Sequence, residues 1–262
     1  DYRKTRGFLD RALAINPRCV EGLVHRGANL LHNRQFQAAE AKLEEALGIN
    51  PRHPEVLSHL GSVRYVLGDR EGWEKHLRQA LAVNAQFADA ERILGDHLAW
   101  LYRFAAAVPV YREALARDPE HVAALHGIAK CLVYTGDGPE AAKLLRRAQD
   151  LQPGQVNPWR NNVLAAQELI AEEYRAVRAK GLAITLHQDD IGVLSQYMLP
   201  EHEAARAELG RKYGLLPDEE VAIEVLHTWD DFSVRTTGFR GCTALGACFG
   251  NFVTLVSPGD GD

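Results

Sequence analysis

The chain has 262 residues, of which 46% are hydrophobic and 25% are charged, and its formal net charge is −5. These proportions are typical of a globular protein, and the length exceeds the usual size of one domain. The negative net charge offers no basic patch for nucleic acid, and no run of about 18 apolar residues could span a membrane. Four scattered cysteines do not make a disulfide framework, so we expect them to be reduced or packed.

A six-residue phrase of the type Ala-Leu-Ala-Ile-Asn-Pro recurs along the first 155 residues. Its copies begin at Ala12, Ala46, Ala80, Ala114 and Ala148, so each starts 34 residues after the one before. Two further sets of positions recur every 34 residues. The first set holds small residues, where two helices are expected to cross closely, and the second set lies on the following helix. They consist of Gly27, Gly61, Gly95 and Ala129, and of Ala39, Trp73, Ala107 and Ala141.

This pattern resembles the tetratricopeptide repeat, a helix-turn-helix unit of about 34 residues that stacks into a superhelix. A pair of short amphipathic helices must bury its apolar face against the next pair, and a proline after each second helix ends that helix. The resemblance covers residues 1–175 as about four full repeats with partial flanking units. It predicts a mainly α fold, an α-α superhelix, followed by a small and incomplete α+β module. Because the chain opens without methionine and inside a repeat, we expect its natural start upstream, and no localisation is predicted.

The resemblance implies a concave groove, lined by the first helix of each unit, that binds a protein or peptide partner. Aromatic side chains with a few charges on this surface suit an extended peptide. The alternative interpretation is that Trp100 and Tyr134, again 34 residues apart, fill gaps between helices. Counting along the repeat places these residues in the groove: Ser62, Tyr65, Arg92, Asp96, Trp100, His126, Lys130, Tyr134 and Arg160.

Near Lys180 the period breaks, and residues 176–262 are predicted to form the second module. Residues 182–187 read as a strand, residues 191–213 as a long amphipathic helix, and residues 221–226 as a second strand. This order of elements indicates an α+β module.

The rest of the module is predicted from its polar and glycine residues. Gly214 is predicted to be the C-cap of the long helix. A short helix is expected near residues 230–235, and residues 249–256 alternate as a strand with one buried face does. We interpret the aspartate pairs 189–190 and 230–231 as residues at helix N-termini rather than as catalytic carboxylates.

Three segments of the module resemble the peptidase MA-like family of zinc metallopeptidases, which follow tetratricopeptide arrays in some bacterial proteins. They are residues 226–238 (LHTWDDFSVRTTG), 244–250 (ALGACFG) and 253–258 (VTLVSP). The resemblance implies a strand-rich lobe that precedes the zinc-binding helix, with its last strand at the edge of the sheet beside the active-site cleft. The predicted edge-strand residues, which would pair with a peptide, are Phe249, Asn251, Val253 and Leu255. The alternative is an interior strand.

The chemistry of such a peptidase needs two histidines four residues apart on a helix, with a glutamate between them. No two of the eleven histidines have this spacing, and Arg206 stands where His202 would need its partner. We therefore predict no catalytic residue, no metal site and no cofactor in this chain, with zinc only in a longer protein.

Two hypotheses of different class follow. The first is a non-catalytic scaffold whose repeats bind a protein or peptide. The second is the recruiting array and front part of a zinc metallopeptidase whose His-Glu-x-x-His helix lies downstream of residue 262.

Overall fold

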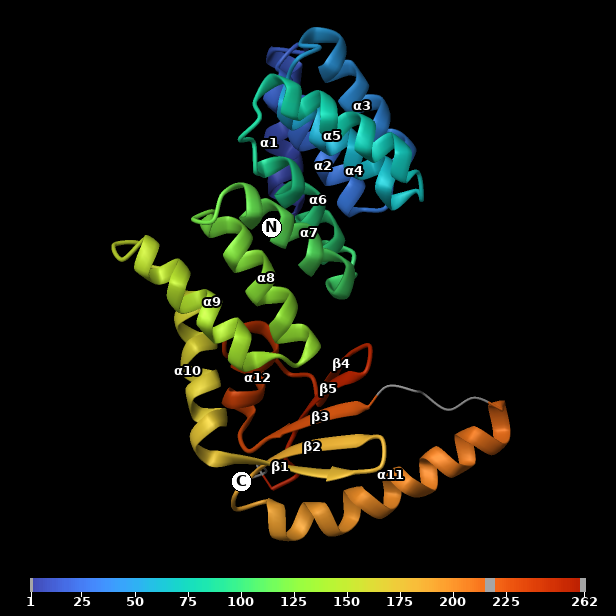
Figure 1. The fold of residues 1–262 in the computed structure, drawn as a ribbon, viewed down its shortest axis with the longest axis vertical. Helices are drawn as coiled ribbons and strands as arrows, with labels where there is room; N and C mark the ends of the chain where they lie inside the picture. The colour runs from blue at the N-terminus through green and yellow to red at the C-terminus, as the bar shows by residue number, and fades with distance from the viewer. Residues whose placement is uncertain (1, 215–219, 260–262) are drawn as a thin grey trace. The chain divides into compact units, whose positions relative to one another are not determined.

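The computed structural model describes residues 2–214 and 220–259, and within them the chain forms twelve helices and five strands. By their contacts these elements form two compact units, which divide between Cys131 and Leu132. The helices before the first strand are α1 (Tyr2–Ile15), α2 (Val20–His32), α3 (Phe36–Ile49), α4 (Pro54–Val66), α5 (Arg70–Val83), α6 (Asp89–Trp100), α7 (Phe104–Arg117), α8 (Val122–Thr135), α9 (Gly138–Leu151) and α10 (Pro158–Glu173). The later elements are β1 (Tyr174–Ala179), β2 (Leu182–His187), α11 (Ile191–Tyr213), β3 (Val221–Leu226), α12 (Trp229–Thr237), β4 (Gly246–Phe249) and β5 (Phe252–Val256) (Figure 1).

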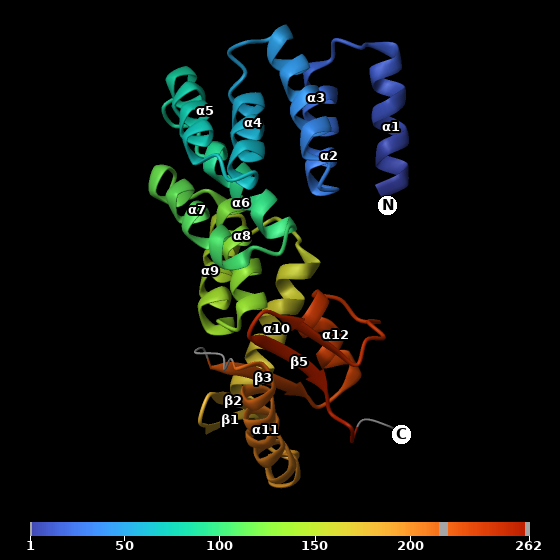
Figure 2. The same cartoon turned by 90° about the vertical axis from the view of Figure 1, so that its right-hand side faces the viewer.

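The N-terminal unit is built from antiparallel helix pairs, as the 34-residue period predicts (Figure 2). Helix α2 packs against α3, α4 against α5 and α6 against α7. Apolar residues at helical spacing meet between the pairs, and Leu23, Leu43 and Leu60 belong to one buried cluster there. Among the helices within the described ranges, none is both long and apolar enough to cross a bilayer.

The predicted column of small residues lies where the two helices of a pair cross. A Cβ atom added at Gly27 would lie 2.6 Å from Leu43, and one at Gly95 would lie 2.7 Å from the Tyr111 ring. At Gly61 the neighbour is Trp73, also at 2.7 Å, so the tryptophan that departs from the alanine column fills the space against this glycine. The close crossing inferred from the sequence is therefore confirmed in three successive pairs.

Replacement of Gly95 by alanine should destabilise the chain, although alanine favours helix. We expect a net loss of about 1 kcal/mol, because overpacking costs about 1–3 kcal/mol while helix propensity returns about 1 kcal/mol. Tyr111 cannot move away freely, since it is buried and its hydroxyl donates to Asp96. Gly48→Ala in α3 is the matched control: nothing lies within 4 Å of its Cβ position. Urea unfolding of both variants tests this, and a stabilised Gly95→Ala chain would contradict the close crossing.

The C-terminal unit contains a five-stranded sheet in the order β1-β2-β3-β5-β4. The three central strands are parallel, and β1 and β4 pair antiparallel with their neighbours at the two edges. Alternate residues point to opposite faces. On one face of the sheet, Val225 packs with Leu194 and Met198 from the first half of α11. On the other face, Leu226 packs with Phe232 of α12.

Most predicted elements of this unit form as expected. Strand β2, helix α11 and strand β3 have the predicted bounds, and Gly214 ends α11 in the left-handed conformation with φ 67°. Strand β1 was not predicted. The change from helices to strands comes at Tyr174, whereas the contacts divide the chain within α8.

The prediction of one edge strand over residues 249–256 is wrong. A two-residue loop, Gly250 and Asn251, joins β4 to β5, with φ 71° at the glycine. Two-residue hairpin loops of this kind favour glycine at their first position. Because the alternation of side chains continues from one strand through the loop into the next, the sequence reads as one strand and the turn is not seen. The partners of β5 are β3 and β4, so Val253 and Leu255 lie on an interior strand, Asn251 lies in the turn, and Phe249 ends the edge strand β4.

Candidate functional site

The structure separates the nine predicted groove residues into different environments. Ser62 is fully buried, because α4 packs against both α2 and α6, and its hydroxyl donates to the Ser58 carbonyl at 2.8 Å. Arg160 is also buried, and its Nη2 donates to the Gln155 carbonyl at 2.9 Å. Placing Ser62 and Arg160 on an open surface was therefore wrong.

Two of the predicted aromatic residues pack against neighbouring rings. The ring of Tyr65 stands edge-on to Trp73, with Arg70 over its face. In the C-terminal unit, Tyr134 lies 4.6 Å from the ring of Phe249. The ring that Tyr134 contacts belongs to strand β4 and not to a neighbouring helix, so its role in binding stays a prediction.

Two of the predicted charged residues form ion pairs within the N-terminal unit. Arg92 forms ion pairs with Asp89 and Asp96, and Asp96 also accepts a hydrogen bond of 2.6 Å from the Tyr111 hydroxyl. His126 is half-buried and Lys130 is exposed. The role of these residues in binding stays a prediction.

Trp100 is the predicted groove residue that combines exposure with a fixed position. It is 56% exposed, yet its indole stacks on the His32 ring with centroids 4.5 Å apart and planes at 20°. Its Nε1 donates to the His32 carbonyl at 3.2 Å. Trp100 and His32 occupy the same position in their repeats, which are two repeats apart, and their contact joins the ends of α6 and α2.

Beneath Trp100 lies a group that we call the repeat histidine cluster, made of His32, His59 and His97 from α2, α4 and α6. His59 Nδ1 and His97 Nε2 are 2.8 Å apart, so one ring donates to the other. The rings of His32 and His59 stand edge-on to His97, at 4.9 and 5.0 Å. His97 is almost completely buried.

Two rings of the repeat histidine cluster, His32 and His97, are neutral at pH 7. Burial, and next the nearby His59, lower the pKa of His32 to about 4 and hold the pKa of His97 well below its usual value. His32 Nε2 and His97 Nδ1 are buried nitrogens without a hydrogen-bond partner among the described residues. A proton added here would lie among other imidazoles and close to Arg92.

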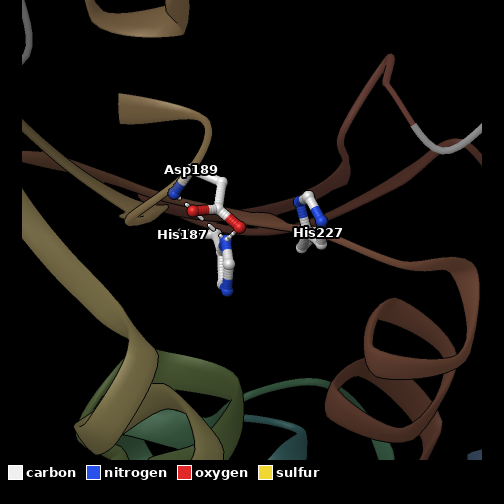
Figure 3. Close-up of side chains that lie close together, drawn as sticks. All are labelled: His187, Asp189 and His227. Carbon is white, nitrogen blue, oxygen red and sulfur yellow. Dashed lines mark hydrogen bonds and ion pairs between the residues drawn. The ribbon is translucent and has the colours of Figure 1, made fainter. Parts of the chain in front are cut away.

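A second group, the sheet-end cluster, lies in the C-terminal unit and comprises Glu173, His187, Asp189, Asp190 and His227. His187 ends β2 and His227 directly follows β3. These strands are parallel neighbours, so both histidines emerge at the carboxyl edge of the sheet (Figure 3). Their rings stack with centroids 4.3 Å apart and planes at 21°.

Carboxylates hold both rings of the sheet-end cluster. His187 Nε2 donates to Glu173 Oε2 at 3.1 Å, and the Asp189 backbone amide donates to His187 Nδ1 at 3.2 Å. His227 Nδ1 donates to Asp190 Oδ2 at 3.0 Å, a hydrogen bond that raises the pKa of His227 above its usual value. Asp190 stands at the predicted N-cap position of α11, but its carboxylate makes no capping bond and binds His227 instead.

The repeats themselves match a known family. Residues 101–165 fit the model of the tetratricopeptide repeat family. This segment is similar to tetratricopeptide repeats. No curated protein sequence matches the chain. Among solved structures, it is similar to YrrB, a tetratricopeptide repeat protein with an unusual peptide-binding site, at 21% identity over 64% of this chain and 84% of YrrB, with TM-score 0.35. It is also similar to yeast Tom70, at 19% identity over 63% of this chain and 36% of Tom70, with TM-score 0.47. A third is a thermophilic tetratricopeptide repeat protein of Thermus thermophilus, at 20% identity over 59% of this chain and 84% of that one, with TM-score 0.40.

Sequence reasoning missed both histidine groups. In the 34-residue repeats, the shared position of His32 and Trp100 was a usable signal, since equal positions in stacked repeats face the same side. His59 and His97 do not share a repeat position, so only their packing brings them together. His187 and His227 are 40 residues apart, and a spacing rule for ligands on one helix cannot detect them.

Proposed function

We propose that the tetratricopeptide repeats of the N-terminal unit bind an extended segment of a partner protein, with Trp100 as the main anchor. The observation that carries this proposal is a largely exposed indole held flat against His32 by stacking and by a hydrogen bond. A tryptophan that is already immobilised loses little side-chain entropy when a partner covers it. Tryptophan is also enriched among the residues that dominate binding energy.

The surroundings of Trp100 support a peptide as the ligand. Asp96, one turn away on α6, leaves 45% of its side chain exposed although it pairs with Arg92. Uncharged histidine rings lie behind the indole, so the anchor site is apolar at its centre with polar groups beside it. This arrangement is the one that interfaces of high affinity use.

Trp100→Ala should weaken peptide binding strongly. Peptides would be selected from a displayed random library against the full chain, and their affinities measured for each variant by fluorescence anisotropy. We expect a loss of at least about 2 kcal/mol, or roughly 30-fold, because an anchor side chain is removed. Tyr197→Ala, which removes a comparably exposed ring from α11, is the control and should leave affinity unchanged. Peptides that bind Trp100→Ala as tightly as the parent chain would refute the proposal.

The second candidate function is the front part of a zinc metallopeptidase. One observation favours it: β4 lies at an edge of the sheet, and among the described strands it pairs only with β5. Its outer backbone groups could take a peptide as an added strand. The coding sequence downstream of residue 262 tests this alternative, since a His-Glu-x-x-His helix would support it and its absence would leave the scaffold function. We expect the chain alone to cleave no peptide.

A further inference from the structure

The sheet-end cluster places nitrogen and oxygen ligands of the chain together at the carboxyl edge of parallel strands. In open sheets with helices on both faces, ligands bind outside this edge. One ligand atom from each of His187, Asp189 and His227 lies within 4.8 Å of the other two. They come from the end of β2, the loop before α11 and the residue after β3 (Figure 3).

The hydrogen bonds of the two histidines to carboxylates leave one nitrogen of each ring without a proton. His187 donates its Nε2 proton to Glu173, so its Nδ1 carries the lone pair. His227 donates its Nδ1 proton to Asp190, which leaves Nε2 as the nitrogen that can bind an ion. Metal-binding histidines almost always donate their other ring proton to a carboxylate or carbonyl, which fixes the tautomer and makes the ligand more basic.

We propose that His187, His227 and Asp189 bind a divalent transition-metal ion such as Zn²⁺, with Glu173 and Asp190 as the carboxylates that orient the two rings. Two imidazoles with one carboxylate favour zinc and its neighbours over Mg²⁺ and Ca²⁺, which prefer oxygen ligands. The side chain of Asp189 is 72% exposed and that of His227 is 38% exposed, so solvent reaches the site and can supply further ligands.

Binding requires a local rearrangement of small cost. The Asp189 amide must release its 3.2 Å hydrogen bond to His187 Nδ1, and the stacked His227 ring must turn so that both lone pairs converge. The loss of one neutral hydrogen bond is small beside the free energy that a Zn²⁺ ion releases when it binds several protein ligands. The exposed ligands are the ones that must move, and the buried His187 stays in place.

Titration of the tag-free full chain with ZnCl₂ by calorimetry, and with Co²⁺ by absorption spectroscopy, tests the proposal. We expect one saturable zinc ion per chain and a Co²⁺ d–d spectrum that zinc abolishes. His227→Ala should weaken binding by at least about 100-fold, and Glu173→Gln by about 10–100-fold, as for other groups that orient a ligand. His227 is chosen because it is not buried, so its removal is compatible with folding.

One control and one further ligand variant make the result decisive. His25→Ala removes an exposed histidine of α2 and should leave zinc affinity unchanged, which shows that the loss of an unrelated histidine does not weaken binding. Asp189→Asn keeps the shape of the side chain but removes its charge, and it should weaken binding. Zinc bound equally well by the parent chain and His227→Ala, or no zinc bound by the parent chain, would overturn the proposal. Neither result depends on peptide binding by the repeats.

Discussion

Arg235→Leu should lower the free energy of unfolding of the C-terminal unit by about 3–5 kcal/mol, the usual cost of leaving one member of a buried ion pair without its partner. Arg235 lies on α12 and is 2% exposed. Its Nε is 2.6 Å from Glu224 Oε2, and its Nη1 donates to the Val133 carbonyl at 3.0 Å. The guanidinium also lies over the Phe252 ring, 4.9 Å from the centroid.

The large loss of stability in Arg235→Leu comes from the Glu224 carboxylate that remains in the fold. Glu224 lies on the central strand β3 with a side chain only 13% exposed, and without Arg235 its charge would be buried and unpaired. The double variant Arg235→Met with Glu224→Leu should recover most of the loss, since apolar replacement of both partners is often neutral. Arg240→Ala is the control: its pair with Asp230 is exposed and should contribute at most about 1 kcal/mol.

Amide hydrogen exchange in β3, measured on the full chain, reports the stability of this unit directly. If Arg235→Leu lowered the free energy of unfolding no more than Arg240→Ala does, the ion pair between Arg235 and Glu224 would not stabilise the unit. If the double variant were as unstable as the single one, packing of the arginine side chain, rather than the unpaired charge, would be the cause.

The helices could be predicted from the sequence because each structural requirement recurs at the same position of several repeats. Gly27, Gly61 and Gly95 all lie where two helices cross, so the prediction does not depend on a single residue. Strand β1 has no such support: its sequence, YRAVRA, alternates only weakly, and four of its six residues are exposed. The β4–β5 hairpin was signalled by Gly250 and Asn251, a pair typical of two-residue turns, but the alternation across it reads as one strand.

Depth within the fold was harder to predict than position along a helix. The repeat frame places Ser62 on the side of α4 that faces the groove, but α2 and α6 cover that side. Likewise, the sequence places Asp190 correctly at the start of α11, but His227, which takes its carboxylate, comes from beyond that whole helix. Contacts of this kind depend on how strands are ordered in the sheet, which no local pattern records.

Acid should destabilise the N-terminal unit at pH values where carboxylates are still ionised. His32 and His97 are neutral in the folded state, because their pKa values lie below those of the unfolded chain, near 6.5. As the pH falls below about 6.5, the unfolded state binds protons that the folded state excludes. Each such group costs about 1.4 kcal/mol per pH unit, and the effect of His32 ends near its folded pKa of about 4.

We expect the free energy of unfolding of the N-terminal unit to fall by about 2–4 kcal/mol between about pH 6.5 and 4.5. This loss is smaller than two fully buried histidines would give, because His32 is partly exposed to solvent. The Glu55 carboxylate does not contribute in this window: its hydrogen bond to His59 lowers its pKa, so its stabilisation is lost only at lower pH. Amide exchange in α4 and α6 of the full chain, measured across this range, gives the stability at each pH.

The slope of stability against pH, rather than the stability itself, identifies the cluster as the cause. His97→Gln removes one titrating ring and should reduce the slope by up to one proton, whatever it costs at neutral pH. His25→Ala, which removes an exposed ring from the same unit, should leave the slope unchanged. An equal slope in the His97→Gln and parent chains would show that His97 is protonated as readily in the folded state as in the unfolded chain. The His97 ring behind Trp100 would then not be held neutral in solution, and the apolar centre of the proposed peptide site would be lost with it.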